Sequence, residues 1–404
     1  MRSTWLVAIV VTVLVGGRPI QAGGPFVYAD NGTIVKWASS GGHTNIVLTF
    51  DQGKLGVLTN SQANALVANV PGVWNGVPTA TVNLTISSTQ LTTDVTEVNY
   101  LPILFSGFPH GYNPVVYDED GAIIDTQFGL GMRNSILAFA GPVFQSDPKP
   151  PNHPLGNIIE GQMVLNGRVL DGVNNGYSNP EYTQSEFEGV IVHEMGHMLG
   201  LDHSQINVTD DKNDDQPTMF PAFYGGTAMR SLSPDDIGWI SHLYPSSQYA
   251  TSFGSITGQI IQRTGTTDSG FQGLNVIARR VGGTRVDAIS CVSGYVYRVN
   301  YGPIDLAGRY LIPGAPPGSY TVEIEKIYPG FTGGHSVGPL DPPVGFPGIS
   351  SPEYYNGANE SAYDNSTDKS NVSVTAGAQT ANINIILNTE IPPLNSASRW
   401  SLYR

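Results

Sequence analysis

The sequence predicts an α+β domain built on a twisted mixed sheet, followed by an all-β sandwich. Two observations carry this prediction. Between Gly23 and Pro245, strand-like and helix-like runs are mixed, and this part holds 22 acidic and 7 basic residues. From Ser246 onward the chain holds 11 acidic and 10 basic residues, and helical periodicity is absent from Ile256 to Thr389. We therefore expect two domains of different architecture.

Residues 1–22 are predicted to be a secretory signal peptide. Arg2 precedes an uncharged run from Trp5 to Val15, and small residues near Ala22 indicate cleavage there. The alternative is a membrane anchor, but the 11 residues of this run fall short of the roughly 20 that span a bilayer. We expect a secreted, extracellular protein without stable membrane insertion.

The first domain, residues 23–245, contains the following predicted elements. Residues 61–68 are predicted to be a helix with Asn60 as its cap. A loop rich in proline, residues 147–154, is expected to separate the last two of four strands. Those strands are Thr44–Phe50, Ala80–Ile86, Ser135–Ala140 and Gln162–Leu165.

The second domain is predicted at residues 256–390, after a linker at 246–255 and before a tail at 391–404. The linker is polar and built of small residues. The chain of 404 residues contains 48 Gly and 29 Pro, a composition that favours strands and turns over long helices. Alternating apolar residues predict half-buried strands around two triplets: Tyr320, Val322 and Ile324, and Ile383, Ile385 and Leu387.

The segment His193–His203, HEMGHMLGLDH, lies at the end of a predicted helix from Gln184 to Leu199. Thr183 and Glu186 fit a capping box at its start. His193 and His197 are four residues apart, which at about 100° per residue places both imidazoles on one helix face.

His203 would point away from that face if the helix continued. Gly200 predicts the end of the helix, because glycine takes the left-handed conformation, and a turn after it can return His203 to the other two histidines. Three neutral imidazoles suit a catalytic Zn²⁺ with one open position. The alternative is a helix with buried structural histidines.

These residues resemble the zinc signature of the metzincin metallopeptidases, and Leu199–Ser204 resembles the matrixin branch. Pro217–Phe223 is similar to the Met-turn and the wall that follows it in that family. The resemblance implies that Met219 lies beneath the zinc, and that Pro221 and Phe223 line the pocket for the residue after the scissile bond. Residues 232–244 resemble the last matrixin helix, with Ser233 as cap and Pro234 at the first helical position.

The resemblance implies a zinc endopeptidase in which His193, His197 and His203 bind zinc and Glu194 is the general base and then the general acid. One departure concerns latency. The only cysteine is Cys291, far downstream, so the thiol latch of many matrixins cannot operate here.

Two acidic clusters are candidates for Ca²⁺, which prefers oxygen ligands. One comprises Asp118, Asp120 and Asp125; the other lies in the loop 207–216 and includes Asp210 and Asp214. Neither matches the twelve-residue calcium loop, and solvated turns are the alternative.

The second domain resembles the carboxypeptidase regulatory-like, or transthyretin-like, sandwich family. The similarity rests on Asp305, Gly308 and Tyr310, and on the run Pro317–Tyr320. This resemblance leaves two roles open: docking of substrate or of a surface, and a spacer.

The sequence thus predicts a secreted zinc endopeptidase that acts on polypeptides. The alternative is an exported polypeptide-binding or adhesion protein with a catalytically silent metzincin domain. The net charge of −14 argues against nucleic acid as a partner, because phosphate backbones select Lys and Arg.

Overall fold

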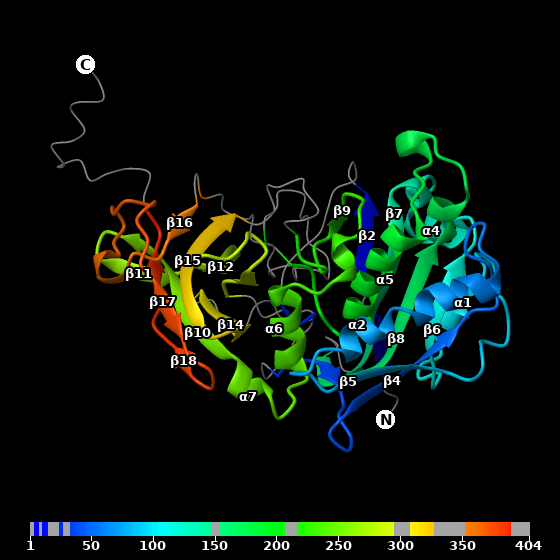
Figure 1. The fold of residues 1–404 in the computed structure, drawn as a ribbon, viewed down its shortest axis with the longest axis horizontal. Coiled ribbons are helices and arrows are strands. Elements are labelled where there is room, and N and C mark those ends of the chain that lie inside the picture. Colours follow the sequence, from blue (N-terminus) through cyan, green and yellow to red (C-terminus); the bar gives the residue numbers. More distant parts are fainter. Residues whose placement is uncertain are drawn as a thin grey trace.

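The computed structural model describes residues 4–7, 10–14, 24–26, 33–147, 153–204, 206, 216–294, 308–326, 349 and 352–388. Two halves are visible, a mixed sheet with helices and a group of strands, and helix α6 (Pro234–Leu243) lies between them (Figure 1).

The first half is organised by a nine-stranded sheet with the main order β5-β4-β6-β8-β7-β2-β9. Strands β3, β4, β5, β6 and β8 pair in parallel, and β7 pairs antiparallel to β8. The bounds are β1 Thr4–Val7, β2 Val10–Leu14, β3 Lys36–Trp37, β4 Thr44–Phe50, β5 Val82–Ile86, β6 Asn113–Asp118, β7 Ile136–Asp147, β8 His153–Asn166 and β9 Ala222–Phe223.

Helix α5 (Gln184–Met198) packs on β7 and β8, and α1 and α2 pack against it. The indole Nε1 of Trp74, on α2, donates a hydrogen bond to the carbonyl of Val192 at 3.0 Å. Eleven of the fifteen residues of α5 are buried, so the helix is part of the core. The other helices are α1 Asn60–Ala68, α2 Pro71–Asn75, α3 Tyr100–Leu104, α4 Ala122–Phe128 and α7 Tyr249–Ser252, with short 3-10 turns at 132–134, 167–170, 176–178, 228–230 and 357–359.

The predicted capping box of α5 is confirmed. The Thr183 hydroxyl accepts from the amide of Glu186, whose carboxylate accepts from the amide of Thr183 at 2.9 Å. The prediction for α1 was off by one residue, because Thr59, and not Asn60, is the cap and forms a capping box with Gln62.

The second half consists of two five-stranded sheets. One contains β11-β10-β14 with β18 and β19, and the other contains β13-β12-β15-β16 with β17. This agrees with the expected all-β architecture, while the family of this half stays a prediction. The bounds are β10 Gly254–Thr264, β11 Thr267–Gly270, β12 Leu274–Arg280, β13 Ala288–Val292, β14 Arg309–Ala315, β15 Gly318–Lys326, β16 Glu353–Tyr354, β17 Val372–Val374, β18 Gln379–Thr380 and β19 Ile385–Ile386.

The predicted linker is partly regular structure. Residues 249–252 form α7, and β10 begins at Gly254. Buried side chains of the two halves belong to one hydrophobic cluster, which includes Leu48 and Ile191 from the first half and Ile256 and Val322 from the second. The halves are therefore packed together.

The segment predicted to be a signal peptide contributes two strands. β1 and β2 each pair antiparallel with β7, and β2 also pairs in parallel with β9. Cleavage near Ala22 stays a prediction. Among the described residues, no helix is both long and apolar enough to cross a bilayer.

We predict that Thr183→Ala lowers the free energy of unfolding by about 1 kcal/mol, because the first turn of α5 loses its cap. Thr183→Asn should restore most of the loss, since asparagine caps as well as threonine. Urea unfolding of both variants measures this, and equal losses in both would contradict a capping role.

Candidate metal centre

The centre begins with two histidines on one face of α5. His193 and His197 are fully buried, and their ring centroids lie 4.6 Å apart. The i, i+4 spacing stacks their side chains on adjacent turns, as expected for a helix.

The end of α5 brings in the third histidine. Gly200 has a φ of +88°, and its amide donates to the carbonyl of His197 at 2.9 Å. The amide of Leu201 donates to the carbonyl of Gly196 at 3.0 Å, which completes a Schellman motif. The chain then reverses, and His203 returns over the helix end, as predicted.

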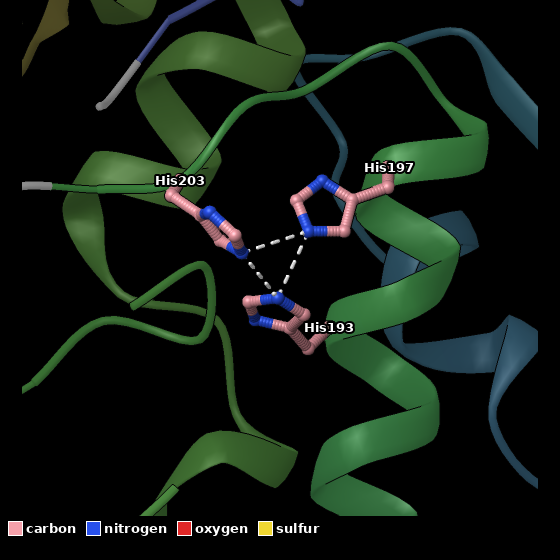
Figure 2. A group of neighbouring side chains, drawn as sticks. All are labelled: His193, His197 and His203. Atoms are coloured by element: carbon pink, nitrogen blue, oxygen red, sulfur yellow. Dashed lines mark hydrogen bonds between the residues drawn. The ribbon is translucent and has the colours of Figure 1, made fainter. Parts of the chain in front are cut away.

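The three imidazoles converge on one point (Figure 2). Their Nε2 atoms are 2.9 Å apart for His193 and His197, and 3.1 Å apart for each pair that includes His203. Two nitrogens at about 2.05 Å from one tetrahedral zinc would lie about 3.3 Å apart, so the arrangement fits this ion. Among the described residues, these histidines form the one group of three or more metal-ligand side chains that meets at a point.

Hydrogen bonds fix the rings in the tautomer that binds metal. His193 Nδ1 donates to the carbonyl of Thr218 at 2.7 Å, and His197 Nδ1 donates to the carbonyl of Leu201 at 2.8 Å. Their Nε2 lone pairs therefore face the centre. Burial lowers the pKa of His193 to about 4, and burial together with His193 holds the pKa of His197 well below its usual range, so both rings are neutral at pH 7.

Glu194 follows His193 on α5, and its side chain is fully buried. The next turn of the helix packs closely on Met219, because a Cβ added to Gly196 would lie 2.3 Å from Met219 Sδ and 3.0 Å from Trp74. Met219 thus supports the turn of helix between the two histidines, and its position beneath a zinc ion stays a prediction.

Asp236, on the first turn of α6, holds the turn that contains Met219. Its carboxylate accepts from the amides of Thr218 and Met219, both at 3.0 Å, and from the amide of Ser233 at 2.7 Å. Thr218 in turn orients His193. Asp236 therefore acts on the metal centre through the backbone of the Met219 turn.

Pro221 and Phe223 are buried beside this turn. Phe223 lies in β9 and packs edge-on against Tyr182, with ring centroids 5.2 Å apart. Their role in a substrate pocket stays a prediction.

The candidate calcium ligands lie on and before α4, and their observed partners are protein groups. Asp118 accepts from the amides of Ile123 and Ile124, and burial raises its pKa to about 7. Arg133 binds Asp125 at 2.6 Å and Asp120 at 3.3 Å. Calcium at this cluster stays a prediction, and the second acidic cluster, residues 210–215, lies outside the described residues.

Sequence reasoning missed the residues that orient the histidines, namely Thr218, Leu201 and Asp236. The two Asp residues after Ser233-Pro234 were visible, but a first-turn Asp is sufficiently explained by the helix dipole. Only the folded chain brings this carboxylate to the Met219 turn.

We predict that Asp236→Asn lowers the affinity for zinc by about 10- to 100-fold, as is typical when a group that orients a metal ligand is changed. The Asp236 carboxylate uses both of its oxygens to accept from the amides of Thr218, Met219 and Ser233, whereas asparagine has only one acceptor oxygen. Competition with a zinc chelator measures the affinity, and Asp268→Asn, at an exposed hairpin, is the control. Equal affinities in both variants would contradict this role.

Comparison with known proteins agrees with this geometry. Residues 121–245 match the family model described as Matrixin. "Metalloendoproteinase 5-MMP" of Arabidopsis thaliana is 33% identical over 129 residues, which are 30% of this chain and 34% of that protein. The match therefore spans about a third of the curated relative.

Two solved structures overlap weakly with the chain. The minor pilin GBS52 of Streptococcus agalactiae is 12% identical over 36% of this chain and 48% of its own, with a TM-score of 0.19. The pilus 2b backbone protein of group B streptococcus is 15% identical over 34% of this chain and 42% of its own, with a TM-score of 0.16. These scores are too low to indicate a shared fold. The matrixin match, which contains all three histidines, supports a matrixin-like metzincin domain with the α+β fold of that family.

Proposed function

We propose that this protein is a secreted zinc-dependent endopeptidase that hydrolyses peptide bonds in polypeptides. The observation that carries the proposal is the convergence of three buried imidazoles, whose Nε2 atoms lie within 3.1 Å of one another, beside the buried residue Glu194 on the same helix. The match to the matrixin family supports the same reaction class.

His193, His197 and His203 would hold the zinc ion. Zinc bound there lowers the pKa of water and polarises a carbonyl. Glu194 accepts the proton of the attacking water and later passes it to the leaving amine. The hydrogen bonds to Thr218 and Leu201 keep the imidazoles of His193 and His197 from rotating.

We propose that the position of β2 between β7 and β9, here called the slot, receives an extended peptide substrate. Strand β2 lies antiparallel to β7, parallel to β9 and in contact with α5. Its backbone therefore completes a sheet beside the helix that carries His193 and His197 (Figure 1). Addition of a strand to a sheet edge is a general mode of peptide recognition, in which main-chain hydrogen bonds supply affinity.

Export follows from the predicted signal peptide, residues 1–22. If these residues are removed after export, β2 leaves the sheet, and the edges of β7 and β9 become available to another chain. In this proposal the segment that directs secretion also fills the peptide slot until it is cleaved.

We predict that Glu194→Gln reduces kcat for cleavage of a denatured protein by at least about 10²-fold, the lower range for loss of a general base. Zinc content should stay unchanged, because the three histidines remain. Glu188→Gln, on the same helix and paired with Arg230, is the matched control and should retain activity.

Mass spectrometry of the products reads the cleavage sites, and metal analysis verifies equal zinc content. If the wild-type protein binds zinc and cuts no polypeptide, even when it starts at Gly23, the endopeptidase assignment fails. The catalytically silent, polypeptide-binding alternative would then hold.

We also predict that the chain starting at Gly23 has a kcat/KM about tenfold or more above that of the chain that retains residues 1–22. A tethered strand competes at an effective concentration in the millimolar range. Steady-state kinetics on one fluorogenic peptide compare the two forms, and equal kcat/KM values would show that β2 does not obstruct the slot.

A further inference from the structure

The first turn of α6 carries two adjacent buried carboxylates that face different partners. Asp236 holds the Met219 turn. Asp235 accepts from the amide of Ser290, in β13, at 2.7 Å and from the side chain of Ser204. Ser204 directly follows His203 in the chain, so one side chain links the C-terminal sheets to the third histidine of the metal centre.

Burial and the neighbouring Asp236 raise the pKa of Asp235 to about 7. A carboxylate in such a place is costly unless donors satisfy it. Two of its donors are Ser290, in the C-terminal sheets, and Ser204, in the loop after His203. Asp235 is therefore satisfied only when the C-terminal sheets and this loop are both in place.

The edge of β13 is covered by α6. β13 pairs with β12 on one side, and on the other side Ser290 donates its amide to Asp235 while its carbonyl accepts from Trp239 Nε1 at 2.9 Å. Helix α6 thus satisfies backbone groups of an edge strand, which would otherwise be open to pairing with another chain.

A second contact joins the loop after His203 to the same sheet. Ile206 is fully buried in a cluster with Ile277 of β12 and Ala288 of β13. Residues alternate between the faces of a strand, so Ile277 lies on the opposite face from Val276, which belongs to the main core. The outer face of this sheet therefore anchors the chain three residues after His203.

The backbones of the two halves also approach closely. Gly238 of α6 lies against Gly314 of β14, and a Cβ added to Gly314 would be 2.3 Å from the Gly238 Cα. A contact this close fixes the distance between α6 and the C-terminal sheets.

We propose that the C-terminal sheets are a structural part of the metal centre, and that they position His203 through Asp235, Ser204 and Ile206. Asp235 is a positioning residue, because it acts through Ser204 and does not itself meet the metal. The C-terminal half is then neither a spacer nor solely a docking module. This inference rests on the three-histidine zinc site of the proposed function and is independent of peptide hydrolysis.

Two glycine variants test the proposal in the full-length protein. Gly314 and Gly265 have φ values of +63° and +64°, but a Cβ at Gly265 would meet nothing within 4 Å. Gly314→Ala and Gly265→Ala therefore place a side chain at the same left-handed φ, and only Gly314→Ala separates α6 from β14. Chelator competition should show zinc affinity about 10- to 100-fold lower for Gly314→Ala than for Gly265→Ala.

A second pair of variants, Ile277→Ala and Ile289→Ala, removes the same side-chain atoms from opposite faces of one sheet. Ile277→Ala opens space under Ile206, while Ile289→Ala opens space in the main core. Zinc affinity should fall more for Ile277→Ala, and this pair decides the question if Gly314→Ala does not fold by circular dichroism.

Equal zinc affinities within the pair that folds would overturn the proposal. Because the experiment measures zinc affinity and not cleavage, it tests the role of the C-terminal sheets separately from the endopeptidase assignment. A wild-type protein that binds zinc without cutting polypeptides contradicts only the latter, and matched affinities in the variants contradict only the coupling.

Discussion

The structure depends on holding three imidazole Nε2 atoms within 3.1 Å of one another in a fully buried place. The Nε2 lone pairs of His193 and His197 repel each other in this arrangement, and burial disfavours the protonation that would relieve the repulsion. A cation bound by all three nitrogens resolves the conflict. The hydrogen bonds from Nδ1 of His193 and His197 to backbone carbonyls prevent ring rotation, so the surroundings specify metal binding.

Much of the fold serves to hold these carbonyls and the third ring. The end of α5 is secured by Trp37 and Tyr244, whose side chains donate to the carbonyls of Met198 and Leu199. The Met219 turn is held by Asp236, and the amide of Ser204 donates to the carbonyl of Met219 at 2.7 Å. Helix α6 thereby supports one side of the centre with Asp236 and meets the C-terminal sheets with Asp235.

The features that the sequence predicted correctly are those that depend on residues close together in the chain. Helical periodicity, the Thr183 capping box and the glycine at 200 were sufficient to place His193, His197 and His203 together. Asp235 and Ile206 act through partners that are distant in sequence, so no local pattern marks them. Asp236 forms a local capping box with Ser233, but that pattern does not reveal its bonds to the amides of Thr218 and Met219. The cap of α1 was misplaced by one residue because Thr59 and Asn60 are both good caps, and only the position of Gln62 decides between them. The pairing of β2 with β7 was not foreseen, because an apolar run after an N-terminal Arg is typical of a leader whether or not it can also form a strand.

The most direct test is X-ray absorption spectroscopy at the zinc edge on the zinc-loaded, full-length protein. The account predicts three imidazole nitrogens at about 2.0 to 2.1 Å and one further light ligand around a single tetrahedral ion. Replacement of His203 by Ala should remove one imidazole from the shell. A shell dominated by carboxylate oxygens, or one that is unchanged in His203→Ala, would contradict the assignment of the metal centre.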